Sequence, residues 1–208
     1  MDYRKILNQV PEDYYERGTR TNLLQFMWHS WKWITLKKMF SGVEGNILDI
    51  GCADGNLTGK IKSEFPKAKV TGVDMYEKSL DFARKNHPNI EFISADARKL
   101  PFKNGQFDVI VAVEVLEHIP QNERAVREVY RCLAKNGRFI VVQDTDNFLF
   151  NFIWFFWTKW KGKVWDNSHI SCMKPNGLAA LLRKNGFKIE KKQFSHFGME
   201  VAFSTVKK

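Results

Sequence analysis

The residues NILDIGCADGNLTG occupy Asn46–Gly59. An apolar run, Ile47–Ile50, stops at a turn that holds Gly51 and Gly55, and a segment compatible with a helix begins at Asn56. This order is typical of a buried parallel strand, a tight turn and a helix. Glycine lets the backbone turn sharply and lets a ligand approach closely, and the N–H groups at the start of the helix would face that ligand.

Strand and helix patterns alternate downstream of this unit. Strands are predicted at 69–73, 90–94, 107–113 and 138–143, and helices at 77–86 and 122–134. The chain ends with a predicted helix at 176–184 and two strands, 187–194 and 199–206, joined by a short turn. Acidic residues follow three of the earlier strands: Asp74, Asp96 and Glu114. The pattern predicts an α/β fold whose parallel strands place these carboxylates at one ligand-binding edge.

The glycine turn resembles the first motif of the class I S-adenosylmethionine-dependent methyltransferases, an acidic residue followed by G-x-G-x-G. Here it runs from Asp49 to Gly55 as DIGCADG, with Ala53 at the middle glycine position. We expect the backbone at Ala53 to avoid a positive φ, because alanine carries a Cβ. The segments FISADARKLPF and FDVIVAVEVLEHI extend the resemblance, which is strongest over 43–143. Within this class, the sequence is similar to the methyltransferases of ubiquinone and menaquinone biosynthesis.

The resemblance implies how the adenosine half of S-adenosylmethionine is bound. Asp74 would accept hydrogen bonds from both ribose hydroxyls, and Asp96 would accept one from the exocyclic amine of adenine. Met75 would lie against the adenine ring, with Ala97 as a small neighbour.

The methionine half carries an ammonium and a carboxylate. The resemblance assigns these groups to the backbone around Gly51, Cys52 and Glu114, in a loop that includes Gly55 and that Asp49 would brace.

The resemblance also implies the architecture. We expect a Rossmann-like seven-stranded sheet, mostly parallel with a C-terminal antiparallel hairpin, in a single domain of 208 residues. This domain would comprise an N-terminal helical cap (1–42), a cofactor-binding core (43–144), an aromatic lid insertion (145–171), and a C-terminal helix and hairpin (172–208).

One apolar stripe marks the N-terminal cap. It consists of Leu24, Met27, Trp28, Trp31 and Ile34, which recur at the spacing of one helix face. Two interpretations are open: a helix packed on the domain, or a cap over the ligand pocket. Lys32, Lys37 and Lys38 are expected on the polar side.

The insertion contains ten successive largely aromatic residues, 148–157, followed by Lys159, Lys161 and Lys163. This run is shorter than the roughly 20 residues that a membrane span needs. Three interpretations are open: packing within the domain, a lid over a lipophilic acceptor, and peripheral contact with an anionic membrane.

Methyl transfer to a phenol or an amine needs a group that removes a proton. His169 is the candidate catalytic base, because its surroundings, WDNSHI before a Lys-Pro and a helix, resemble a segment of the quinone-pathway O-methyltransferases; a structural role that ties down the insertion is the alternative. Glu114, Glu117 and His118 would share one side of a helical turn, but three ligands in one turn rarely suffice, so we assign no metal.

Composition limits the function classes. The net charge is 33 − 23 = +10, which fits a small-molecule enzyme with a solvated basic surface but also an RNA methyltransferase. A non-catalytic cofactor-binding interaction protein is a third alternative.

The cysteines and the first residues bear on the compartment. No paired or metal-binding spacing is seen among the three cysteines, Cys52, Cys132 and Cys172, and the first residues lead into no apolar run. We therefore expect a cytoplasmic protein.

Overall fold

A computed structural model describes residues 9–40, 45–160, 165 and 169–208. Several features of the sequence prediction lie outside these ranges: residues 1–8 and 41–42 of the expected cap, residues 43–44 of the expected core, Lys161 and Lys163 of the insertion, and residues 166–168 before His169.

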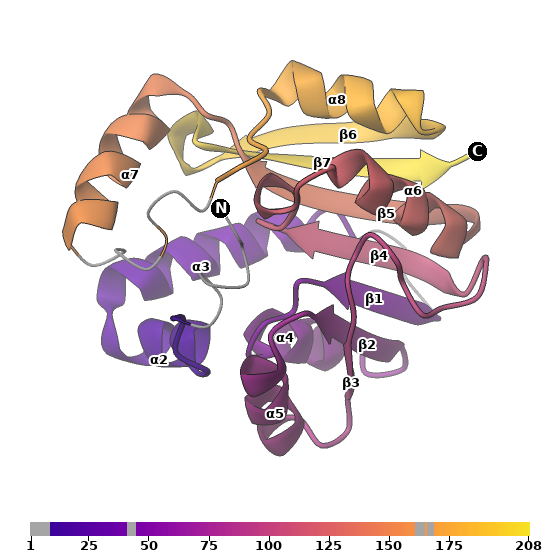
Figure 1. The fold of residues 1–208 in the computed structure, drawn as a ribbon, viewed down its shortest axis with the longest axis horizontal. Coiled ribbons are helices and arrows are strands. Elements are labelled where there is room, and N and C mark those ends of the chain that lie inside the picture. Colours follow the sequence, from indigo (N-terminus) through magenta and orange to yellow (C-terminus); the bar gives the residue numbers. More distant parts are fainter. Residues whose placement is uncertain (1–8, 41–44, 161–164, 166–168) are drawn as a thin grey trace.

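One seven-stranded sheet organises the described chain (Figure 1). Its strands are β1 (Asn46–Ile50), β2 (Lys69–Asp74), β3 (Glu91–Ser94), β4 (Phe107–Val113), β5 (Leu133–Asp144), β6 (Phe187–Ser195) and β7 (Glu200–Lys207). The order across the sheet is β3-β2-β1-β4-β5-β7-β6, and β7 runs antiparallel to both of its neighbours. The prediction of a mostly parallel sheet with a C-terminal antiparallel hairpin is confirmed.

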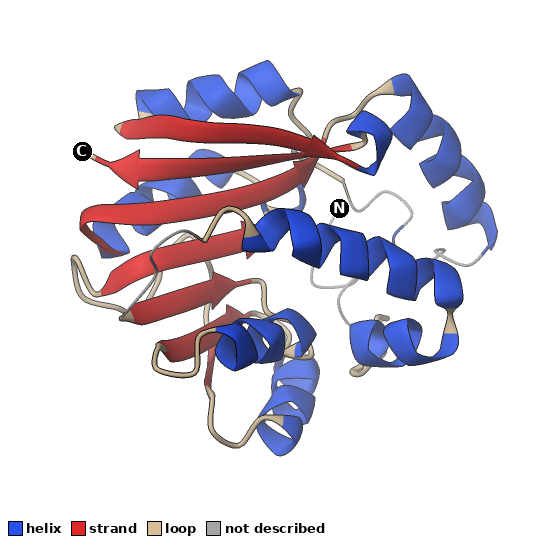
Figure 2. Cartoon of the chain, turned by 180° about the vertical axis from the view of Figure 1, so that it is seen from behind, coloured by secondary structure: helices blue, strands red, loops and turns tan. Residues whose placement is uncertain are grey.

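Helices cover both faces of this sheet. They are α2 (Tyr14–Thr21), α3 (Leu23–Lys37), α4 (Asn56–Glu64), α5 (Glu77–Asn86), α6 (Asn122–Cys132), α7 (Phe148–Trp160) and α8 (Pro175–Lys184), with short 3₁₀ turns η1 (Leu116–His118) and η3 (His196–Gly198). α6 and α8 lie over one face in Figure 1, whereas α4 and the end of α3 lie over the other in Figure 2. In both views α2, α3 and α7 lie beyond the carboxyl ends of the parallel strands.

The side chains of the central strands supply both halves of the core. Leu48 and Ile50 join the buried cluster that includes α6 and α8, whereas Ile47 joins the cluster that includes α4 and Leu36 of α3. Successive strand residues point to opposite faces, and both faces here are covered, so apolar residues of β1 are buried on both sides of the sheet.

The start of β5 differs from the prediction. We expected a helix to Ala134 and a strand from Arg138, but α6 ends at Cys132 and β5 begins at Leu133. Leu133 is fully buried and pairs with Phe107 of β4, and the register then shifts around Asn136, whose φ is +62°. The Asn-Gly pair therefore makes an irregularity within a strand instead of ending a helix.

Most of the apolar stripe of α3 faces solvent, so the stripe is not the side by which this helix packs on the domain. Leu24, Met27 and Ile34 are 77%, 58% and 55% exposed. The opposite side of the helix is the buried one, and it includes Lys32, which was expected on a polar outer face, and Leu36. The spacing of the stripe was right, but the side of the helix that packs on the domain was wrong.

No helix among the described residues combines the length and the apolar character that crossing a bilayer requires. α7, the most apolar helix, has 13 residues.

The orientation of α3 can be tested with a pair of substitutions on that helix. Leu36→Ala should lower the free energy of unfolding by about 2–5 kcal/mol, because Leu36 is fully buried in the core. Ile34→Ala should change it by less than about 0.5 kcal/mol, because that side chain is exposed. Urea unfolding of both variants measures the two values; equal losses would mean that the stripe packs inward.

Candidate active site

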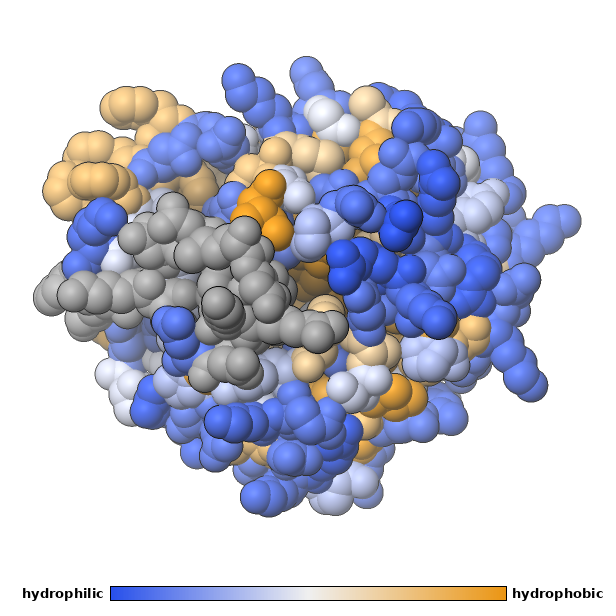
Figure 3. Space-filling model, viewed as in Figure 1, coloured by the Kyte–Doolittle hydropathy of each residue, from blue (hydrophilic) through white to orange (hydrophobic). Residues whose placement is uncertain are grey.

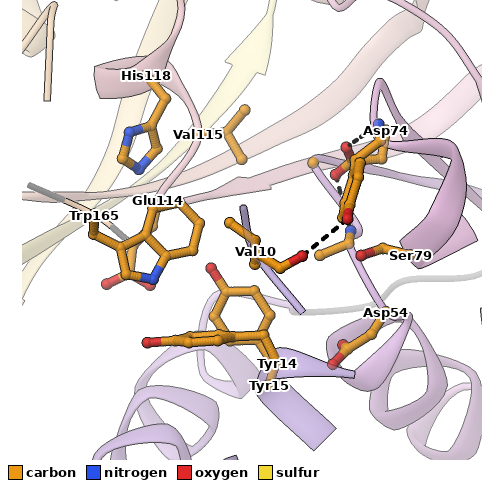
Figure 4. Close-up of a pocket in the computed structure, with 13 residues that line it drawn as sticks. Val10, Tyr14, Tyr15, Asp54, Asp74, Ser79, Glu114, Val115, His118 and Trp165 are labelled. Carbon is orange, nitrogen blue, oxygen red and sulfur yellow. Dashed lines mark hydrogen bonds between the residues drawn. The ribbon is translucent and has the colours of Figure 1, made fainter. Parts of the chain in front are cut away.

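Two neighbouring cavities open beyond the carboxyl ends of β1, β2 and β4, with empty volumes of about 550 and 620 Å³. They share five lining residues: Tyr15, Gly51, Ala53, Asp54 and Glu114. The first also contacts Asp74, His118 and Trp165, and Figure 4 shows these side chains around it together with Tyr14 of α2. The second extends toward His29 and Lys32 of α3.

The glycine loop after β1 forms the floor of both cavities. Gly51 has φ +74°, and a Cβ at this position would lie 2.4 Å from Cγ2 of Val115, so the position requires glycine. Ala53 also has a positive φ, +46°, which contradicts the expectation from sequence. The amide of Ala53 donates a 2.9 Å hydrogen bond to Oδ2 of Asp74, and this bond stabilises a conformation that alanine seldom adopts.

Asp74, at the end of β2, lies at the centre of this arrangement. Its Oδ1 accepts a hydrogen bond from the amide of Tyr76 at 2.9 Å, while its Oδ2 holds the glycine loop. The side chain lines the first cavity, and burial raises the pKa of its carboxyl, partly opposed by these backbone donors. The carboxylate is therefore fixed in position beside a space that a ligand can enter.

Asp49 lies under the loop. Its Oδ2 accepts a 2.7 Å hydrogen bond from the hydroxyl of Thr58 in α4, and burial raises the pKa of its carboxyl to about 7. It lines neither cavity, so its contacts tie β1 to α4. Cys52, also buried, lines the second cavity, and Gly55 adopts φ +79° at the start of α4.

Two of the residues predicted to meet adenine, Asp96 and Ala97, follow the neighbouring strand β3, whereas Met75 follows β2. The amide of Ala95 donates to the carbonyl of Asp74, so the ends of β2 and β3 are adjacent. Asp96 is held by the guanidinium of Arg98, with Nη2 at 2.6 Å from Oδ2 and Nε bonded to both oxygens. Asp96, Ala97 and Met75 line neither of the two cavities.

Asp54 is a site residue that the sequence analysis did not single out. Its Oδ2 accepts a 2.7 Å hydrogen bond from the amide of Glu16 and its Oδ1 one from Asn56, so it joins α2 to the glycine loop. Burial raises the pKa of Asp54 to about 6. The motif gives no signal for this contact, because Glu16 lies outside it.

A buried lysine joins α3 to the sheet. Nζ of Lys32 lies 2.5 Å from Oε1 of Glu114 and 3.0 Å from Oε1 of Glu200, and the lysine side chain is only 7% exposed. Burial acts to lower the pKa of Lys32, but Glu114 and Glu200 outweigh it and raise that pKa. Burial likewise acts to raise the pKa of Glu114, but the ammonium of Lys32 lowers it to about 2. This pair remains ionised across the neutral range.

Other carboxyls gather behind this pair. Ligand atoms of Glu114, Asp144 and Glu200 lie within 4.8 Å of one another, a spacing that could hold a metal ion, but Lys32 already places a cation against two of them. Glu117 of η1 is fully buried, and neither of its carboxyl oxygens has a hydrogen-bond partner among the described residues. Burial raises the pKa of Glu117 to about 8, so its carboxyl is mainly protonated at neutral pH.

The ring of His169 packs against α7, beside this cluster. Its ring stacks on Trp154 at 4.4 Å, and its Nε2 lies 3.6 Å from Oδ2 of Asp144. Burial, and then the neighbouring His118, lower the pKa of His169 to about 4, so the ring is uncharged at neutral pH. His169 lines neither cavity, whereas His118, 4.9 Å away between ring centroids, lines the first.

The buried Glu117 predicts a pH dependence of stability. Its carboxyl keeps a proton in the folded state up to a pKa of about 8, whereas the unfolded chain releases it near 4.5, so folding loses stability as the pH rises through this window. Glu117→Gln removes this loss, at most about 1.4 kcal/mol per pH unit for one proton. Urea unfolding between pH 5 and 8 gives the free energy of unfolding of both proteins. The difference in favour of Glu117→Gln should grow as the pH rises, and a difference that does not change with pH would contradict the raised pKa of Glu117.

Comparison with known proteins agrees with the fold. Residues 48–141 match a methyltransferase-domain family. A demethylmenaquinone methyltransferase of Lactococcus lactis is 30% identical over 68% of this chain and 58% of its own length. A ubiquinone biosynthesis O-methyltransferase of Bordetella parapertussis is 33% identical over 67% of this chain and 61% of its own length. The chain thus matches less than two thirds of either relative.

Among solved structures, a methyltransferase of Thermotoga maritima that depends on S-adenosylmethionine superimposes with a TM-score of 0.71 at 25% identity, with 99% of each chain covered. The family match, the strand order and the glycine motif agree with one another. The chain belongs to the class I S-adenosylmethionine-dependent methyltransferases, as its motif predicted.

Proposed function

We propose that this protein transfers a methyl group from S-adenosylmethionine to a small, lipophilic or aromatic acceptor. The observation that carries the proposal is the position of two acidic residues, Asp74 and Glu114, on the wall of one cavity whose floor is the Gly51–Gly55 loop.

The cavity has the chemical groups that this cofactor needs. Asp74 offers carboxylate oxygens to the ribose hydroxyls, and Gly51, which has no side chain, lines the same cavity. Glu114 offers negative charge toward an ammonium, and its low pKa keeps it ionised. Asp96 would meet the adenine amine only if it exchanges part of its contact with Arg98 for that hydrogen bond.

S-adenosylmethionine supplies, when bound, a methyl group on a positively charged sulfur that an acceptor oxygen, nitrogen or carbon attacks. The protein must align the acceptor and exclude water. α2 and Trp165 line the first cavity and shield it in part.

The acceptor is inferred from two lines of support. Aromatic rings, those of Tyr14, Tyr15 and Trp165, line the first cavity, and apolar and aromatic linings suit flat, weakly polar ligands. The names of the Lactococcus and Bordetella relatives describe methylation in menaquinone and ubiquinone synthesis, so we infer a quinone precursor or a similar compound.

His169 is the proposed base for an acceptor that carries a proton. Its ring is uncharged at neutral pH, so it can accept a proton, and its Nε2 lies 3.6 Å from Oδ2 of Asp144. The neighbouring His118 lines the cavity and offers a direct comparison.

We also propose that the aromatic insertion contacts a membrane surface, where a lipophilic acceptor would be concentrated. Phe148, Phe152 and Phe156 of α7 expose more than half of their surface.

Cofactor binding tests the first part of the proposal. Asp74→Asn should weaken the binding of S-adenosylmethionine by roughly 100-fold, since about 1.5–3 kcal/mol is lost for each hydrogen bond to a charged group. Glu91→Gln, an exposed carboxylate at the start of β3, should bind as the unmodified protein does. Isothermal titration calorimetry gives both affinities, and equal affinities would remove Asp74 from the site.

The catalytic base is tested by comparing two histidines. His169→Gln should keep cofactor affinity and lower kcat by roughly 100-fold or more with a demethylated quinone as acceptor, the usual loss for a general base. His118→Gln should affect KM more than kcat, because its ring lines the cavity. If His118→Gln abolishes turnover while His169→Gln does not, the assignment of the base is wrong.

A further inference from the structure

The outward side of α3 is a continuous apolar surface. Leu23, Leu24, Met27, Trp31 and Ile34 are between 43% and 77% exposed and recur along one side of the helix. The opposite side lies against the site, where His29, Lys32 and Trp33 line a cavity. Soluble helices normally bury such a stripe, so this one is matched to an apolar partner that the described chain does not supply.

α7 presents a second apolar surface of the same kind. Phe148, Phe152, Phe155 and Phe156 are between 54% and 84% exposed, and their rings are in contact with one another along the helix. Figure 3 shows these side chains gathered over α7 at the upper left of the molecule.

The turn η3 contacts both α3 and the residues just before α7. Nε2 of His196 donates a 3.0 Å hydrogen bond to the carbonyl oxygen of Trp28, and its ring stacks on that of Trp28 at 3.9 Å, so η3 is fixed to α3. Thr145 and Asn147, just before α7, both donate to the carbonyl of Gly198 in η3. Figure 2 shows the three elements at the same end of the molecule.

Phe197 of η3 extends the apolar surface of α3 toward the start of α7, where Gly198 accepts a hydrogen bond from Asn147. It is 80% exposed, and its ring lies 5.4 Å from that of Trp31. The apolar surfaces of α3 and α7 are thus parts of one surface, which we call the docking face: Leu23, Leu24, Met27, Trp31, Ile34, Phe148, Phe152, Phe155, Phe156 and Phe197.

The charges around the docking face are mainly positive, with Asp146 as an acidic residue just before α7. Exposed lysines border it at the end of α3, at Lys38, in β6, at Lys191 and Lys192, and in α7, at Lys159. The Nζ of Lys191 donates to the carbonyl of Lys38, which places β6 beside the end of α3. Neither α3 nor α7 contains an acidic residue.

We propose that the docking face binds an anionic lipid bilayer through α3, η3 and α7 together. The inference extends the membrane contact proposed above from the insertion to the N-terminal helix, and it specifies the charge of the lipid. Aromatic and aliphatic side chains enter the boundary between headgroups and acyl chains, while the bordering lysines meet anionic headgroups, each contributing about 1 kcal/mol.

A second copy of this chain fits the docking face less well. A two-fold contact would bring the same lysine border of each copy together, and neither helix offers a carboxylate to pair with it. An anionic bilayer instead offers acyl chains to the apolar side chains and negatively charged headgroups to the lysines.

Vesicle sedimentation of the full chain tests the proposal without cofactor or acceptor. The protein should sediment with vesicles of 70% phosphatidylcholine and 30% phosphatidylglycerol, and bind pure phosphatidylcholine at least tenfold more weakly. Met27→Gln with Ile34→Gln on α3, and Phe152→Gln with Phe156→Gln on α7, should each lower partitioning by roughly tenfold or more, because each pair removes apolar surface from the contact.

Charge reversal separates the docking face from general attraction by a basic protein. Lys38→Glu with Lys192→Glu should lower partitioning to the anionic vesicles by roughly tenfold. Lys85→Glu with Lys135→Glu changes the net charge equally at exposed positions outside the face and should lower it far less. Circular dichroism of each variant should match that of the unmodified protein.

Three results would overturn the proposal. They are no binding to either vesicle, equal losses from the two charge reversals, and dimers in light scattering that the α3 pair converts to monomers without any vesicle binding. Loss of binding by the α7 pair alone would reduce the contact to the insertion and refute the role of α3. Methyl transfer to a water-soluble acceptor, assayed without vesicles, is a separate readout: its absence would count against the proposed function and leave the docking result intact.

Discussion

The ion pair between Lys32 and the carboxylates of Glu114 and Glu200 determines how the helices close over the sheet. A buried ammonium is costly unless it is paired, so the side of α3 that carries Lys32 has to face the strand ends. Glu114 directly follows the parallel strand β4 and Glu200 begins β7 of the antiparallel hairpin, so the side chain of Lys32 connects α3 to both parts of the sheet. The direction of the apolar stripe follows: with Lys32 inside, the stripe is outside.

Around this pair, the site consists of groups that hold one another in place. Asp74 fixes the glycine loop, Asp54 fixes α2 to that loop, and Asp49 fixes α4 to β1. Each carboxylate uses its oxygens on neighbours of the protein, which holds it in a defined position before any ligand binds. Substrate and cofactor would therefore meet a preformed cavity.

The sequence was sufficient to predict the sheet but only part of the site. The strands β1, β2 and β4 are near-continuous apolar runs buried on both faces, so their limits could be predicted within a residue or two. The glycine motif identified the loop, although Ala53 adopts the positive φ that its Cβ was expected to prevent, because a hydrogen bond to Asp74 supports it. Periodicity gives the face of a helix but not its direction, so the buried Lys32 and the contacts of Asp144 and Glu200, which depend on long-range pairing, could not be predicted.

The attachment of α2 has a consequence for the exchange of ligands. This helix has no buried residue of its own, yet it places Tyr14 and Tyr15 over the cavity, and the backbone hydrogen bond from Glu16 to Asp54 connects it to the glycine loop. Segments with so little buried surface open at a small free-energy cost while the rest of the domain stays folded. The residence time of a bound molecule would then be governed by the detachment of a single eight-residue helix, not by breathing of the sheet.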